Sequence, residues 1–139
     1  MKTASLTLEI QIVRAVLIGI GAAAIIVLVG GWAARAHGAD QIPPAAMKEA
    51  EEIFKTRCTT CHGAGGKGDG PAAVALNPKP RDMTDEAWQK SVSDEQIDKI
   101  IAGGGGAVGK SVLMPANPDL ASKPDVVKAL RQIVRKFAK

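Results

Sequence analysis

The residues of this chain with the most distinctive chemistry are Cys58, Cys61 and His62, in the stretch "FKTRCTTCHGAGGKGDGP". They include both cysteines of the 139-residue chain and one of its two histidines. Two thiols at this spacing can form a disulfide, half of a metal site, a redox pair or an attachment point for a cofactor. The sequence around the motif favours one of these four possibilities.

Three of the possibilities fit this chain poorly. A disulfide between Cys58 and Cys61 would close a very short loop and stabilise the fold little. A thioredoxin-type pair requires a neighbouring βαβ pattern, which the sequence lacks. Structural zinc requires four ligands at a recognised spacing, and beyond the motif only His37 is available. The remaining interpretation is that Cys-Thr-Thr-Cys-His attaches one haem c covalently, with His62 as an iron ligand.

The N-terminal part of the chain differs in composition from the rest. Residues 15–34 read "AVLIGIGAAAIIVLVGGWAA", carry no charge and are flanked by Arg14 and Arg35. A membrane-spanning helix needs about 20 apolar residues, whereas a signal peptide has an apolar core of about 7–15. We therefore expect residues 1–36 to be a transmembrane anchor, with a signal peptide cleaved after Ala36 as the alternative. Either one places the remainder on the periplasmic side of the inner membrane.

The rest of the chain predicts an all-α domain with long loops, without strands or repeats. We assign residues 37–46 to a linker and residues 47–139 to the domain. Only three aromatic residues follow residue 36, so we expect the cofactor to complete the core. Spacing and capping patterns predict four helices: one from Pro43-Pro44 into the motif, a short one capped by Thr84, one capped by Ser93 and ended by Gly103, and a last one opened by Ser122 and Pro124. The segments 63–82 and 103–118 are predicted to be loops, with a turn at 72–76 in the first.

The charge pattern excludes one class of partner. The net charge is +4, and basic and acidic residues alternate along residues 37–139. A nucleic-acid-binding protein shows a basic stripe interleaved with aromatic residues. We therefore expect no nucleic-acid partner.

Together, these features resemble the class I monohaem c-type cytochromes over nearly the whole domain. Ala50, Phe54 and Cys58, spaced by four, stand where that family has a small residue, an aromatic residue and the first cysteine, although its usual glycine is Ala50 here. The resemblance implies a small cytochrome c fold in which the helix that leads into the motif crosses the C-terminal helix. The stripe expected to face this first helix consists of Leu130, Ile133 and Val134.

The resemblance also implies a second iron ligand. Met114 follows a glycine-rich loop and precedes Pro115, as the distal methionine does in the family. A loop position lets a thioether approach the iron from the face opposite His62. Met83, His37 and an open sixth site remain alternatives.

Other residues are expected near the haem from the same resemblance. A histidine ligand donates its second ring N–H to an acceptor that fixes its orientation, and in the family this acceptor is a proline carbonyl. Pro71 is the matching residue, with an ordinary turn proline as the alternative interpretation. Arg81 and Trp88 resemble residues that face the haem propionates.

The expected function is electron transfer rather than catalysis, because iron bound by His62 and Met114 has no vacant position for oxygen or substrate. The expected partners are the membrane, through residues 15–34, and membrane redox proteins: an oxidase, a quinol-oxidising cytochrome complex or a reaction centre. Two alternatives stay open. One is a fixed haem subunit of a larger respiratory or photosynthetic complex. The other is a haem enzyme or gas sensor with a labile sixth ligand.

Overall fold

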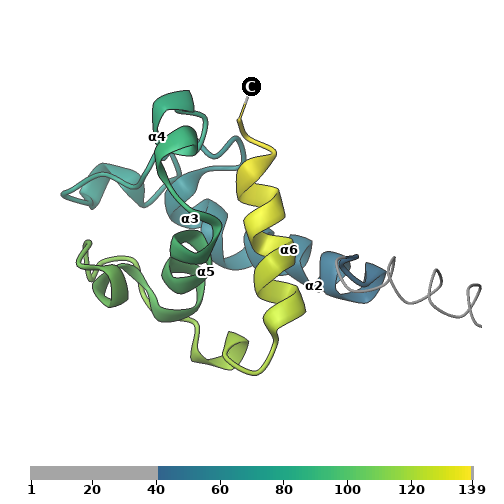
Figure 1. Ribbon diagram of the computed structural model, residues 1–139. Coiled ribbons are helices and arrows are strands. Elements are labelled where there is room, and N and C mark those ends of the chain that lie inside the picture. The colour runs from purple at the N-terminus through teal and green to yellow at the C-terminus, as the bar shows by residue number, and fades with distance from the viewer. Residues whose placement is uncertain (1–40, 139) are drawn as a thin grey trace, which may run out of the picture. The chain divides into compact units, whose positions relative to one another are not determined.

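The computed structural model describes residues 41–138, and this part of the chain is helical (Figure 1). Its helices are α2 (Pro44–Ile53), the π-helical segment η1 (Phe54–Cys58), α3 (Thr59–His62), α4 (Glu86–Ser91), α5 (Asp94–Gly103) and α6 (Pro124–Arg135). Three 3₁₀ turns join them: η2 (Ala73–Ala75), η3 (Gly105–Val108) and η4 (Pro118–Leu120). No strand occurs between residues 41 and 138, as predicted.

Several sequence predictions concern residues outside this range. The anchor or signal segment 1–36, with its apolar run 15–34, and the alternative ligand His37 lie outside the described residues. Within residues 41–138, no helix combines the length and the apolar character that crossing a membrane requires.

The first helical stretch runs from Pro44 to His62 and ends at the cysteine motif. Pro44 occupies the first turn, where a missing N–H removes no helical hydrogen bond. The helix thus begins slightly before Met47, inside the segment assigned to the linker. Within it, η1 is a single π turn, which changes the register of the side chains that follow. Gly63, with φ of 74°, ends the stretch directly after the motif.

The core forms where α2 crosses α6 (Figure 1), and no other pair of helices packs as extensively among the described residues. Ala50 on α2 and Ala129 on α6 are completely buried, which lets the two helices approach closely. The stripe predicted on α6 faces this core, with Leu130 and Val134 buried and Ile133 partly buried. The helix crossing implied by the family resemblance is confirmed.

The cap of α4 differs from the prediction. Asp85, not Thr84, is the N-cap residue, and its Oδ1 accepts from the amides of Ala87 and Trp88. Thr84 donates its amide and its hydroxyl to Oδ1 of Asp82, so its side chain is already engaged. The prediction for Thr84 was wrong because the next residue, an aspartate, caps at least as well.

The other caps follow the sequence more closely. Ser93 accepts from the amide of Gln96 at 3.2 Å and caps α5, as predicted. This helix ends at Gly103, and Gly104 continues the chain at a φ of 73°. The last helix starts with Pro124, but Ser122 does not cap it, because the N-cap position falls on Lys123 and makes no side-chain hydrogen bond.

Two long loops extend from the same side of the domain (Figure 1). We call residues 63–82 the His62 loop, because it begins directly after His62, and residues 104–117 the Met114 loop. The turn predicted at 72–76 is present in the first of them as η2. These loops carry Pro71, Arg81 and Met114, to which the sequence assigned a chemical role.

Candidate functional site

The two thiols lie at the end of the first helical stretch. Cys58 is the last residue of η1, and Cys61 lies in α3 directly before His62. Residues three apart on a helix face the same side, so the thiols share one face of the stretch. Both are free and half-buried. Burial raises the pKa of the Cys58 thiol, and the neighbouring Arg57 guanidinium opposes that shift.

His62 is buried and oriented by a hydrogen bond. It is 8% exposed, and its Nδ1 lies 3.1 Å from the main-chain oxygen of Arg81. Burial lowers the pKa of His62, so the ring is neutral at pH 7. A carbonyl can only accept, so Nδ1 carries the single ring proton and Nε2 keeps its lone pair. This is the tautomer in which Nε2 can bind a metal.

The acceptor is Arg81, so the prediction that the carbonyl of Pro71 orients His62 was wrong. The amides on either side of Pro71, those of Gly70 and Ala72, donate to main-chain oxygens of α3 at 3.1 and 2.9 Å. The chain around Pro71 is therefore fixed along the backbone of α3. The later segment of the His62 loop, at Arg81, supplies the oxygen that contacts the ring.

The position of Arg81 is determined two residues further on, at Met83. The amide of Met83 donates to the oxygen of Gly66 at 2.6 Å. The carbonyl of Met83 accepts from Nε2 of Gln89 at 2.7 Å, and the same Nε2 donates to the carbonyl of Val134 at 2.9 Å. Gln89 is buried and thus connects the segment that orients His62 to helix α6.

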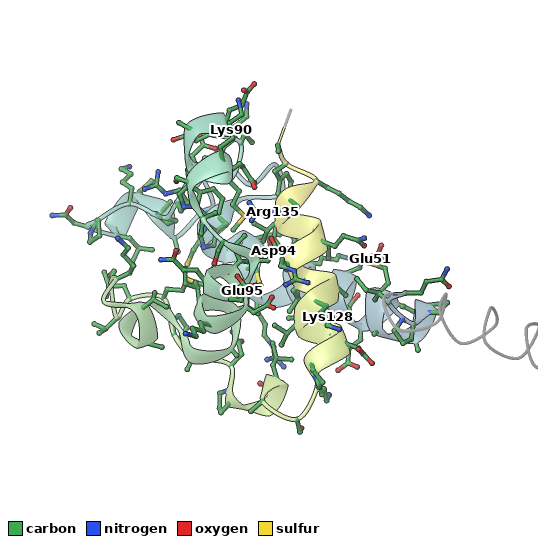
Figure 2. All side chains as sticks on the ribbon, viewed as in Figure 1. Glu51, Lys90, Asp94, Glu95, Lys128 and Arg135 are labelled. Carbon is green, nitrogen blue, oxygen red and sulfur yellow. The ribbon has the colours of Figure 1, made fainter. Side chains whose placement is uncertain are left out.

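Arg135 completes this connection at the end of α6. Its Nη1 donates to the side-chain and main-chain oxygens of Gln89, at 2.9 and 2.7 Å. Its Nη2 donates to the carbonyl of Val92 at 2.8 Å and to Oδ1 of Asp94 at 2.7 Å. Figure 2 shows Arg135 beside Asp94, at the start of α5. We call Gln89, Arg135 and Asp94 the Gln89 network; sequence reasoning missed it.

Met114 is held by main-chain contacts with the glycines that follow α5. The amide of Gly105 donates to its carbonyl at 3.0 Å, and its own amide donates to the carbonyl of Ser111 at 3.3 Å. A Cβ at Gly104 would lie 2.7 Å from the carbonyl oxygen of Met114, so only glycine permits this approach. The glycine-rich sequence before Met114 is therefore a packing surface for the methionine backbone.

Met83, the alternative iron ligand, has a different environment. It is 7% exposed and belongs to the hydrophobic core that α2, α5 and α6 share. Met114 is half-buried and lies in a loop outside that core. Met83 is thus a core side chain, and Met114 is a loop side chain.

The residues present fit a covalently bound haem. The motif supplies two free thiols and a neutral imidazole with a free Nε2. Among residues 41–138, large hydrophobic side chains are strongly exposed at three positions, and all three lie on the two loops: Val74 at 84%, Val112 at 80% and Leu113 at 49%. Apolar side chains on loops beside the motif suit the faces of a porphyrin.

Comparison with known proteins adds independent information. A family model described as "Cytochrome c" matches residues 47–129, which is more than half of the chain. Among solved structures, the chain is similar to one titled "KustC0563 c-type cytochrome", with 31% identity over 65% of this chain and 98% of that chain, and a TM-score of 0.48. No curated protein sequence matches the chain.

Proposed function

Because the chain belongs to the cytochrome c family, we propose that it is a carrier of single electrons in which His62 and Met114 are the axial ligands of the haem. Covalent haem c follows from the family and from Cys58 and Cys61, which with His62 form a CXXCH motif. Haem-based electron transfer is the general function of this family. The axial ligands and the partners are the parts that we propose.

The observation that carries the proposal is the state of His62. The ring is buried, and its Nδ1 lies 3.1 Å from the carbonyl of Arg81, which can only accept a hydrogen bond. Nε2 is therefore the only ring atom that can donate a lone pair, and its direction is fixed in advance. The bound haem supplies one-electron exchange between Fe(III) and Fe(II).

Met114 is proposed for the second axial position because it is the loop methionine. A thioether opposite a histidine raises the reduction potential relative to two histidines. It also closes the sixth position to oxygen and to substrates, so the proposed protein is not an enzyme. Met83 has a sufficient role as a core side chain.

The test compares Met114→Leu with Met83→Leu in the full-length haem-loaded protein. Met114→Leu should abolish the weak far-red sulfur-to-iron absorption band of the oxidised protein, lower the potential and permit carbon monoxide binding after reduction. Met83→Leu conserves volume in the core and should keep the band, at a cost below about 1.5 kcal/mol in stability. If Met83→Leu removes the band and Met114→Leu does not, the ligand assignment is wrong.

We also propose that residues 15–34 anchor the domain on the periplasmic side, close to partners in the same membrane. The nine residues 35–43 separate this apolar run from α2 and reach at most about 30–32 Å. A domain on so short a connection meets membrane proteins most easily, such as an oxidase, a quinol-oxidising cytochrome complex or a reaction centre.

The anchor is tested by N-terminal sequencing of protein from washed membranes. Retention of residues 1–36 supports it, and a mature chain beginning at His37 in the soluble fraction contradicts it. Purification in mild detergent then distinguishes the two modes of electron transfer. A fixed subunit remains with its complex, whereas a mobile carrier separates from it.

A further inference from the structure

Arg57 forms a polar bridge between the two segments that carry the proposed axial ligands. It directly precedes Cys58, and its Nη1 donates to both carboxylate oxygens of Asp119, each at 3.0 Å. The same nitrogen lies 3.4 Å from Oδ1 of Asn117. We call these contacts the Arg57 bridge. They connect the segment that ends in His62 with residues just beyond Met114.

Asn117 attaches the same segment to the end of α5. Its amide donates to the carbonyl of Ala102 at 2.8 Å, and its Nδ2 donates to the carbonyl of Ile101 at 2.7 Å. The chain around Met114 is therefore fixed at two points: the Met114 carbonyl accepts from Gly105, just after α5, and Asn117 is bound to the last turn of α5. The Arg57 bridge is its direct polar connection to the attachment segment.

We propose that Arg57 is a positioning residue for the sixth iron ligand: by holding Asp119 and Asn117, it keeps the Met114 loop against the haem-attachment segment. This inference rests on the proposed function, in which Met114 binds the iron. An interaction present only when the loop is closed shifts the equilibrium toward the methionine-bound state. Loss of the bridge should therefore make Met114 easier to displace.

The charges of the bridge support this role. The hydrogen bond between Arg57 and Asp119 is the largest cause of both pKa shifts: it raises the pKa of Arg57 and lowers the pKa of Asp119. Both groups are therefore ionised throughout the neutral range. Their side chains are each 46% exposed, so the contribution of the bridge is modest and depends on salt.

The experiment is an imidazole titration of the oxidised full-length protein, in which loss of the far-red sulfur-to-iron band measures displacement of the methionine. Arg57→Gln should raise the apparent affinity for imidazole by roughly two- to fivefold, the range expected for an exposed ion pair. Asp119→Asn should give a similar increase in imidazole affinity. Because it leaves the attachment segment unchanged, it tests the bridge even if Arg57→Gln impairs haem loading. The double variant should show little more than either single one.

The matched control is Lys90→Gln, which breaks the ion pair of Lys90 with Glu86, also at 3.0 Å. Figure 2 shows Lys90 on α4. This variant should bind imidazole like the parent protein. High salt should reduce the difference between the parent and Arg57→Gln and leave Lys90→Gln unchanged.

The outcomes separate this inference from the proposed function. If the parent lacks the far-red band and binds imidazole as Met114→Leu does, methionine ligation is wrong and the role of Arg57 fails with it. If the parent has the band and Met114→Leu loses it, but Arg57→Gln and Asp119→Asn bind imidazole like Lys90→Gln, only the positioning role of Arg57 is overturned.

Discussion

The orientation of His62 depends on a peptide group nineteen residues further along the chain, because its ring donates to the main-chain oxygen of Arg81. The side chain of Arg81 takes no part in that bond. It lies over the ring of Trp88, with 5.9 Å to the centroid, and 3.7 Å from the carboxylate of Asp85. Substitution of the Arg81 side chain should therefore matter less to His62 than substitution of Gln89, which holds the carbonyl of Met83, two residues after Arg81.

Gln89→Leu should destabilise the haem-loaded protein by about 2–4 kcal/mol, because it leaves the buried carbonyls of Met83 and Val134 and one donor of Arg135 without this partner. Denaturant unfolding measures the loss. The control is Gln132→Leu on the exposed face of α6, expected to change stability by no more than about 0.5 kcal/mol. Equal effects of the two substitutions would show that Gln89 makes no special contribution.

The pH dependence of the Arg57 bridge follows from the lowered pKa of Asp119, to which Arg57 contributes most and Lys123 adds. An aspartate without such partners, as in the released or unfolded segment, titrates at about pH 3.9. The bridged carboxylate titrates lower. The bridge is therefore fully present above the ordinary aspartate pKa and is lost as pH falls through the lowered value.

The ratio of imidazole affinities of Arg57→Gln and the parent should accordingly stay constant from about pH 5 to pH 8 and approach one only in acid. Taking the ratio at each pH cancels the protonation of imidazole itself. A ratio that changes strongly between about pH 6 and pH 8 would point to a titrating group other than Asp119.

At the scale of elements, the sequence predicts those helices and caps that a local side-chain pattern determines. The apolar stripe of α6 and the cap at Ser93 were readable because each is a local pattern with one strong solution. The cap of α4 was misplaced because Thr84 and Asp85 are neighbouring residues that can both cap a helix. Helix positions were therefore predicted more reliably than the residues at their ends.

The parts of the site that the sequence did not predict depend on main-chain contacts. The π turn η1 changes helical register without any side-chain signature. The carbonyl of Arg81 and its support by Gln89 are pairings between a main-chain group and distant elements, which one sequence does not encode as a motif. The motif Cys58, Cys61 and His62 was readable because covalent attachment requires those residue types in that order.

The His62 loop provides a test at this scale. Gly66 has a φ of 71°, and a Cβ there would lie 2.8 Å from the ring of Phe137. That ring also packs on Phe54, with 5.6 Å between centroids. Gly66→Ala should therefore destabilise the protein by about 1–3 kcal/mol, measured by thermal or denaturant unfolding.

Gly65→Ala is the matched control, because a Cβ added at Gly65 would meet no atom within 4 Å and its φ is not in the left-handed region. It should change stability by no more than about 0.5 kcal/mol. If the two substitutions cost the same, the close approach of this loop to Phe137 does not contribute to stability.

At the scale of the whole molecule, the domain has a small protein core and two loops whose apolar side chains face outward. Leu120 is the largest side chain that is completely buried among residues 41–138. A porphyrin bound at Cys58 and Cys61 would add a large apolar surface beside the loops. Stability should therefore depend on the cofactor as well as on the helices.

Replacing both cysteines by alanine should remove the haem and, with it, the cooperative unfolding transition of the loaded domain. Circular dichroism should show reduced helical content, and the thermal transition should move to much lower temperature or disappear. Alanine at two half-buried positions would by itself have only a small effect. A haem-free variant with the helical content and thermal stability of the parent would contradict this dependence.

The two residues proposed as axial ligands are supported in different ways. The carbonyl of Met83, two residues after the peptide that orients His62, is held by the buried Gln89, whose own partners Arg135 and Asp94 are half-exposed. Met114 is held by Gly105, and its neighbour Asn117 is held by the last turn of α5 and by the half-exposed Arg57 bridge. Segments with fewer buried contacts open locally at lower free energy than the global transition. Because Met83 is buried in the core and the Met114 loop is largely exposed, we expect the amides of this loop to exchange with solvent before that of Met83. In the proposed function, such an opening would release Met114 from the iron while the fold and the covalent attachment persist, and closure of the loop alone would restore the ligated state.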